Sequence, residues 1–198
     1  MKKSHSTLVK QALIVAFISV LPAAYGQVSK ANFKAEPDKT LASAHESFIK
    51  GETTKAGDQI DKAADYVKKQ AHHVAAGSKA DMEKAGDELH KLGENVKSGA
   101  VKSDDDLKKG FAKADREVAK AWHETADEAQ KTGKDSLADL KKAGNSLDGA
   151  AKWSGHHIDE ATQKTLDAVK DAGHASANQV DEWGKSIGHG IDELGHKF

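Results

Sequence analysis

The chain has 198 residues, with 31 acidic and 30 basic side chains, two prolines and no cysteine. Only 35 residues are Val, Ile, Leu or Phe, which is few for the large core of an enzyme domain. The lack of cysteine excludes a disulfide scaffold. The formal net charge of −1 argues against a nucleic-acid binder, which carries a basic excess. The composition favours a helical protein with a weak core.

The first 26 residues have the pattern of a secretory signal peptide. Lys2 and Lys3 precede an apolar run over residues 12–24, and small residues lead up to Gly26. The apolar core is too short for a comfortable transmembrane span, which disfavours the alternative of an uncleaved membrane anchor. We therefore expect a signal peptide over residues 1–26, cleaved after Gly26, and a periplasmic or secreted mature protein.

Residues 27–50 are predicted to be a lead-in linker with one short helix. Pro37 interrupts a helix because it lacks an amide proton and clashes with the preceding turn. A helix is predicted over residues 41–49, ended by Gly51. No proline follows Pro37, which permits long helices in the region 51–198.

The region 51–198 contains a repeat of 29 residues. A unit divides into 11 + 11 + 7 residues and makes eight turns at about 3.6 residues per turn, so one apolar stripe stays on one helix face. The five units begin at Lys55, Lys84, Lys113, Lys142 and Asp171. The most regular apolar position holds Met82, Phe111, Leu140, Val169 and Phe198. The repeat predicts an all-α protein of long amphipathic helices, folded back as a hairpin or loose bundle, with partial disorder in dilute solution left open.

Two positions depart from a continuous stripe. A break is expected near residues 98–103, because Gly99 can end one helix while Ser103 and Asp106 resemble the capping pair of the next. Trp153 falls off the stripe, so the periodicity predicts that it lies on the polar face.

Two segments carry a resemblance to a known family. Residues 55–69 (KAGDQIDKAADYVKK) and 84–97 (KAGDELHKLGENVK) resemble the group 3 late embryogenesis abundant proteins and, more loosely, the exchangeable apolipoproteins. The resemblance covers residues 51–198. It implies a hydrophilic protein that gains helix on drying or on a membrane, shields proteins or bilayers under stress, and has no catalytic residues.

The most apolar stripe lies at the carboxyl end of the chain. Its members recur every three or four residues and are Val180, Trp183, Ile187, Ile191, Leu194 and Phe198. One interpretation is a helix that lies on a lipid surface, and the other is a helix that packs internally or against a partner. Between residues 178 and 198 four acidic residues outnumber two lysines, which does not suit anionic lipids. Internal or partner packing is therefore favoured.

Catalytic and cofactor-binding residues are not expected. The chain has no cysteine nucleophile, no Gly-x-Ser-x-Gly motif and no phosphate-binding glycine loop. His189, Glu193 and His196 have i, i+4 and i+7 spacing, which makes them candidates for a zinc or copper site. A solvated polar face without metal is the favoured interpretation, because the repeats preserve no ligand pattern.

These observations predict an exported, non-enzymatic protective or scaffolding protein of the cell envelope. It would bury its apolar stripe against client proteins or membranes under stress. It would bind no nucleic acid and no small-molecule substrate. One alternative is a constitutively folded helical bundle for protein–protein interaction or self-assembly. The other is a histidine-based metal buffer.

Overall fold

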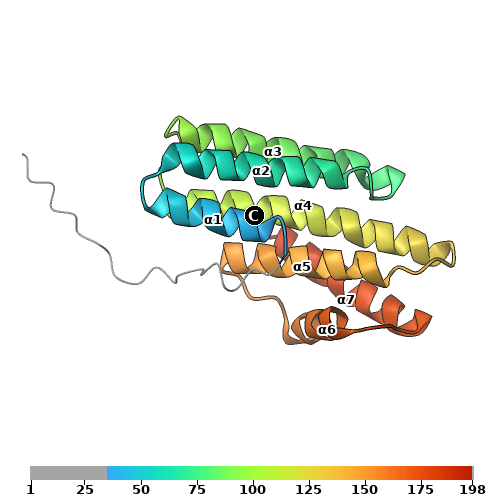
Figure 1. Ribbon diagram of the computed structural model, residues 1–198. Helices are drawn as coiled ribbons and strands as arrows, with labels where there is room; N and C mark the ends of the chain where they lie inside the picture. Colours follow the sequence, from blue (N-terminus) through green and yellow to red (C-terminus); the bar gives the residue numbers. More distant parts are fainter. Residues whose placement is uncertain (1–34, 198) are drawn as a thin grey trace, which may run out of the picture.

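The computed structural model describes residues 35–197, which form seven α-helices, one 3₁₀ helix and no strand (Figure 1). The predicted all-α, folded-back architecture is confirmed. The predicted signal peptide and Phe198 lie outside the described residues. In chain order the elements are α1 (Asp38–Ile49), α2 (Thr53–Gln70), η2 (Ala76–Ser78), α3 (Lys79–Lys97), α4 (Asp104–Lys131), α5 (Leu137–Ser154), α6 (Glu160–Asp171) and α7 (Ala177–Gly195).

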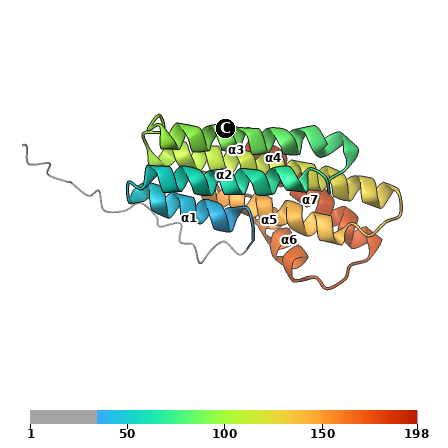
Figure 2. The ribbon, with the colours of Figure 1, turned by 45° about the horizontal axis from the view of Figure 1, so that its top comes forward.

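Helix α4 organises the bundle. It packs against α1, α3, α5 and α7, while α2 packs mainly on α3 and α1. The α2–α3 pair lies on one side of α1 and α4, and α5, α6 and α7 pack on one another on the other side (Figures 1 and 2). No described helix is long and apolar enough to cross a membrane.

The helix ends follow local sequence signals. α3 ends at Lys97 and α4 begins at Asp104, in the segment where the sequence indicated a break. Gly99 has a φ of +70°, a backbone conformation that is strained for residues with a Cβ but not for glycine. The Ser103 hydroxyl accepts a hydrogen bond from the Asp106 amide at 3.1 Å, which caps α4. The chain also turns after α2, α4, α5 and α6, so the 29-residue period does not correspond to one helix per unit.

Helix α1 begins earlier than the sequence indicated. Its first residue is Asp38 rather than residue 41, and Pro37 occupies the N-cap position. A proline is tolerated there because no intrahelical bond requires its amide proton. The earlier start matters, because it places the Asp38 carboxyl inside the bundle with 5% of the residue exposed.

The apolar stripes of the helices join in one core. Met82, Phe111, Leu140 and Val169 are each at most 1% exposed. Among the described residues the exposed large apolar side chains are Ile49 and Tyr66. The carboxyl-terminal stripe belongs to the same core: Trp183 packs against it partly buried, and the buried members are Val180, Ile187, Ile191 and Leu194.

The expectation that Trp153 lies on a polar face is wrong. Trp153 is 2% exposed and packs edge-on against Phe111, with ring centroids 5.0 Å apart. Its indole Nε1 donates a hydrogen bond to Asp38 Oδ1 at 3.0 Å. α5 packs against α4, α6 and α7 and also meets the start of α1, so its buried sector is wider than a single stripe.

Candidate functional site

The first part of the site is the amino-terminal cap of α6. Asp159 Oδ1 accepts hydrogen bonds from the amides of Ala161 and Thr162, at 2.9 and 3.1 Å, and the Thr162 hydroxyl donates to Oδ2. These bonds satisfy amides that have no partner within the helix. The Thr162 hydrogen bonds hold the pKa of the Asp159 carboxyl below its usual range, and His189 acts in the same direction. Asp159 is therefore an ionised carboxylate in a fixed orientation.

The second part is one flank of α7. Ile187 and Ile191 are buried, which fixes the rotation of the helix. Gly190 lies at a close approach of α7 to α5 and α6: a Cβ at that position would lie 2.8 Å from Thr162 Cγ2 and 2.9 Å from Leu147 Cδ2. Because glycine leaves this space free, α7 packs close to the start of α6.

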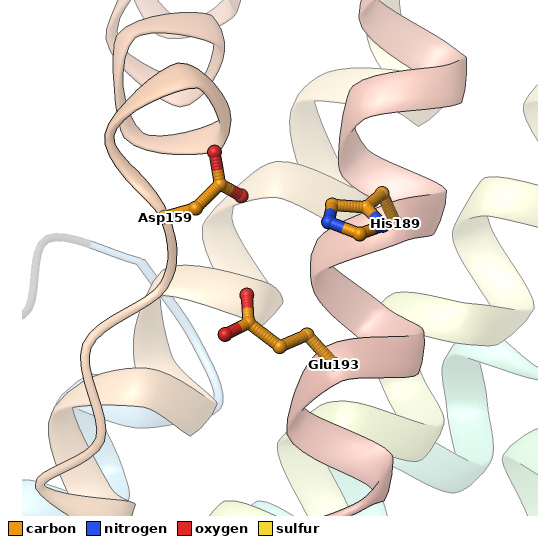
Figure 3. Close-up of side chains that lie close together, drawn as sticks. All are labelled: Asp159, His189 and Glu193. Atoms are coloured by element: carbon orange, nitrogen blue, oxygen red, sulfur yellow. The ribbon is translucent and has the colours of Figure 1, made fainter.

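The two parts meet in a cluster of three side chains (Figure 3). Asp159, His189 and Glu193 each offer one donor atom, and these atoms all lie within 4.8 Å of one another. Figure 3 shows the Asp159 carboxylate pointing from the start of α6 toward His189 and Glu193, which lie one turn apart on α7. The helix spacing of i and i+4 places these two residues on the same face.

One oxygen of the cluster has no partner. Glu193 Oε2 is out of contact with solvent and receives no hydrogen bond from any described residue. Leaving a buried polar atom unsatisfied costs about 1–3 kcal/mol, and more for a charged group. A cation between the three side chains would remove this cost.

The donor set has the chemistry of a zinc site. Zn²⁺ takes imidazole nitrogen and carboxylate oxygen, usually in tetrahedral geometry, and three protein ligands leave a fourth position for water. His189 is exposed, while Asp159 and Glu193 are half-buried. An ion can therefore enter and leave from the His189 side without unfolding of the bundle.

The structure brings together two of the three metal candidates of the sequence. His189 and Glu193 belong to the cluster, whereas His196 is the exposed C-cap residue of α7 and does not. Asp159 is the third side chain of the cluster in place of His196. Sequence reasoning missed it because it lies 30 residues before His189 on another element. Its spacing to Thr162 indicates a helix cap, but no local pattern indicates that this cap faces α7.

Three other histidines make contacts that join helices. Each bonds to a carboxylate or a carbonyl oxygen of a neighbouring helix, which is a structural role. The bonds are His45 Nε2 to Asp104 Oδ1 at 2.5 Å, His90 Nδ1 to Asp61 Oδ1 at 3.0 Å, and His123 Nε2 to the Gly184 carbonyl at 2.8 Å.

Comparisons of the chain with protein-family models, with curated proteins and with solved structures find no match. The resemblance to late embryogenesis abundant proteins therefore stays a prediction.

Proposed function

We propose that the chain is an exported, non-enzymatic helical bundle that reversibly binds a divalent transition-metal ion, best suited to Zn²⁺, through Asp159, His189 and Glu193. The observation that supports this proposal is the convergence of three donor atoms, one from each side chain, together with the buried Glu193 oxygen that has no partner among the described residues. The proposal develops the histidine-based metal buffer, with a carboxylate from a second element replacing His196.

The position of the apolar stripe favours a folded scaffold over conditional folding. A protective role requires an apolar stripe that is free to meet client proteins or membranes. In the folded bundle Ile187 is 0% exposed and Leu194 is 1% exposed, because the stripe packs against the rest of the core. The bundle then serves to hold α6 and α7 in the relative position that the site needs.

The site is built for exchange rather than for structural support. Structural zinc sites use four protein ligands, whereas this site offers three and one of them is exposed. The hydrogen bonds of the α6 cap orient Asp159, and loss of such orienting contacts typically weakens metal binding by about 10–100-fold. We therefore expect reversible binding of one ion per chain.

Isothermal titration calorimetry with Zn²⁺ tests the proposal. The wild-type chain is expected to bind one Zn²⁺, and His189→Ala is expected to lose most of that affinity. Asp159→Asn is the sharper variant, because asparagine caps helix amino termini as well as aspartate but lacks the charge. α6 therefore stays capped while the anionic ligand is lost. Because loss of a contact that only orients a ligand typically lowers metal affinity by about 10–100-fold, we expect loss of the ligand's charge to lower it by at least about tenfold.

His196→Ala is the matched control. It removes an exposed histidine seven residues after His189 that lies outside the cluster, so Zn²⁺ affinity should stay within about twofold of wild type. A titration without stoichiometric heat would refute the proposal. So would an affinity that falls with His196→Ala and stays unchanged with Asp159→Asn.

A further inference from the structure

Two carboxyl groups that do not belong to the proposed metal site face each other inside the bundle. Asp38 begins α1 and is 5% exposed, and Asp115 in the middle of α4 is 0% exposed. No described N–H or O–H group donates to either oxygen of Asp115. The group within its hydrogen-bonding reach is the Asp38 carboxyl. Two ionised carboxylates only accept, so a hydrogen bond between them requires a proton on one.

Helix α5 encloses this pair. Trp153 Nε1 donates to Asp38 Oδ1 at 3.0 Å, and a Cβ on Gly149 would lie 2.6 Å from each carboxylate oxygen of Asp38. The Asp38 carboxyl therefore lies directly on the α5 backbone at Gly149. Through these contacts the pair joins the first residue of α1 to α4 and α5.

The surroundings favour protonation of the pair. Burial raises the pKa of Asp38 to about 6. The hydrogen bonds from Asp115 and Trp153 and the charge of Lys152 oppose this rise, while the negative charge of Asp148 adds to it. Burial also raises the pKa of Asp115 well above its usual range, and the charge of Asp38 reinforces that shift.

A histidine and its carboxylate partner lie beside the indole ring that donates to Asp38. The His45 ring of α1 packs on Trp153, with centroids 5.7 Å apart, and His45 Nε2 contacts Asp104 Oδ1 of α4. The Nε2 atom of this histidine is therefore engaged by Asp104 rather than by either carboxyl of the pair.

The pair is open to solvent protons on one side. Asp38 lines a polar cleft of about 780 Å³, together with Asp148, Gly149 and Lys152 of α5 and residues of α6. Asp115 is fully buried and does not line the cleft. Protons can therefore reach the pair through Asp38 without opening of the helices.

We propose that Asp38 and Asp115 form a proton-dependent latch that fastens the first turn of α1 to α4 and α5. A proton shared between the two carboxyls closes the latch. When both carboxyls are ionised, their repulsion in the core releases the start of α1, and the first turn of that helix opens.

The sign of the pH dependence follows from the direction of the shifts. Folding raises the pKa of both groups, so the folded state binds more protons than the unfolded state. The stabilisation is greatest below the unfolded value of 3.8 for aspartate, and it is lost as the pH rises through about 6. One proton changes the unfolding equilibrium constant about tenfold per pH unit, so Asp38 alone accounts for an increase of about 100-fold across this window.

Urea unfolding at pH values from 4 to 8, with wild type and Asp38→Asn, tests the latch. Asparagine at position 38 can still accept the Trp153 hydrogen bond and donate to Asp115 but does not titrate, so the variant should lose the increase of about 100-fold in the unfolding constant that Asp38 contributes across this pH range. Asp105→Asn is the control, because Asp105 is an exposed aspartate in the first turn of α4, and its pH profile should follow wild type. Identical profiles for all three proteins would overturn the proposal.

Nuclear magnetic resonance of the wild-type chain tests the latch even if Asp38→Asn does not fold. Side-chain carboxyl ¹³C resonances should show two aspartates that titrate above pH 5. Amide hydrogen exchange in the first turn of α1, corrected for the intrinsic rate, should show at least tenfold more opening at pH 8 than at pH 5. Titration of every aspartate near pH 4, or opening that is independent of pH, would overturn the proposal.

Discussion

The substitution Ile187→Ala tests whether the stripe of α7 is packed inside the bundle. Ile187 is 0% exposed, and its Cδ1 lies 3.6 Å from the position that a Cβ on Gly144 of α5 would occupy. The change removes three buried carbon atoms, each worth about 0.8 kcal/mol, and leaves a cavity. We expect a decrease of about 2–5 kcal/mol in the free energy of unfolding, the range for Ile→Ala in a packed core.

The same substitution at an exposed position provides a matched control. Ile49 is 59% exposed at the end of α1, so Ile49→Ala should change stability by at most about 0.5 kcal/mol. Both variants remove the same atoms from a helix. Their difference, measured by urea unfolding followed by circular dichroism at 222 nm, therefore reports burial. If Ile187→Ala lowers the free energy of unfolding no more than Ile49→Ala does, the stripe of α7 is not packed in the core.

Three further predictions concern single contacts. Gly149→Ala should destabilise the bundle by about 1–3 kcal/mol in urea unfolding, because its methyl group would lie 2.6 Å from the Asp38 carboxylate. Gly77→Ala is the control: a Cβ there has no atom within 4 Å, so its free energy of unfolding should be near that of wild type. Ser103→Ala should cost about 1 kcal/mol in urea unfolding through loss of the α4 cap; no change would mean that water replaces the hydroxyl. Burial raises the pKa of the Asp148 carboxyl, but hydrogen bonds from Lys152 and Lys170 outweigh burial and hold this pKa below its usual range. The ionised carboxylate therefore stabilises the folded state above about pH 4, and this stabilisation is lost in more acidic solution. Asp148→Asn should therefore lose less stability than wild type between pH 4 and pH 2, and an unchanged loss would contradict this assignment.

Periodicity was enough to predict the fold class and much of the core. The apolar position that holds Met82, Phe111 and Leu140 is buried throughout its described members, because a stripe on one helix face must be covered by another element. The assumption of a single apolar stripe predicted these positions correctly but placed Trp153 wrongly on a polar face. A single stripe describes a helix with one covered side, and α5 is covered by α4 on one side and by α6 and α7 on others.

The candidate site was predicted only in part, because half of it depends on tertiary contact. His189 and Glu193 share a helix, so their spacing in sequence fixes their distance in space. Asp159 reaches them only because Gly190 allows α7 to approach Thr162 at the start of α6. The Asp38–Asp115 pair has the same origin. Its members lie 77 residues apart, and no local pattern reveals that both carboxyls enter one core.

The metal site can be observed directly in an anomalous-difference map from crystals of the chain soaked in Zn²⁺. We predict one strong peak between Asp159, His189 and Glu193, at about 2.0–2.2 Å from one nitrogen and two oxygen atoms. A peak held by other histidines, such as His156 and His157, with none at this cluster would contradict it.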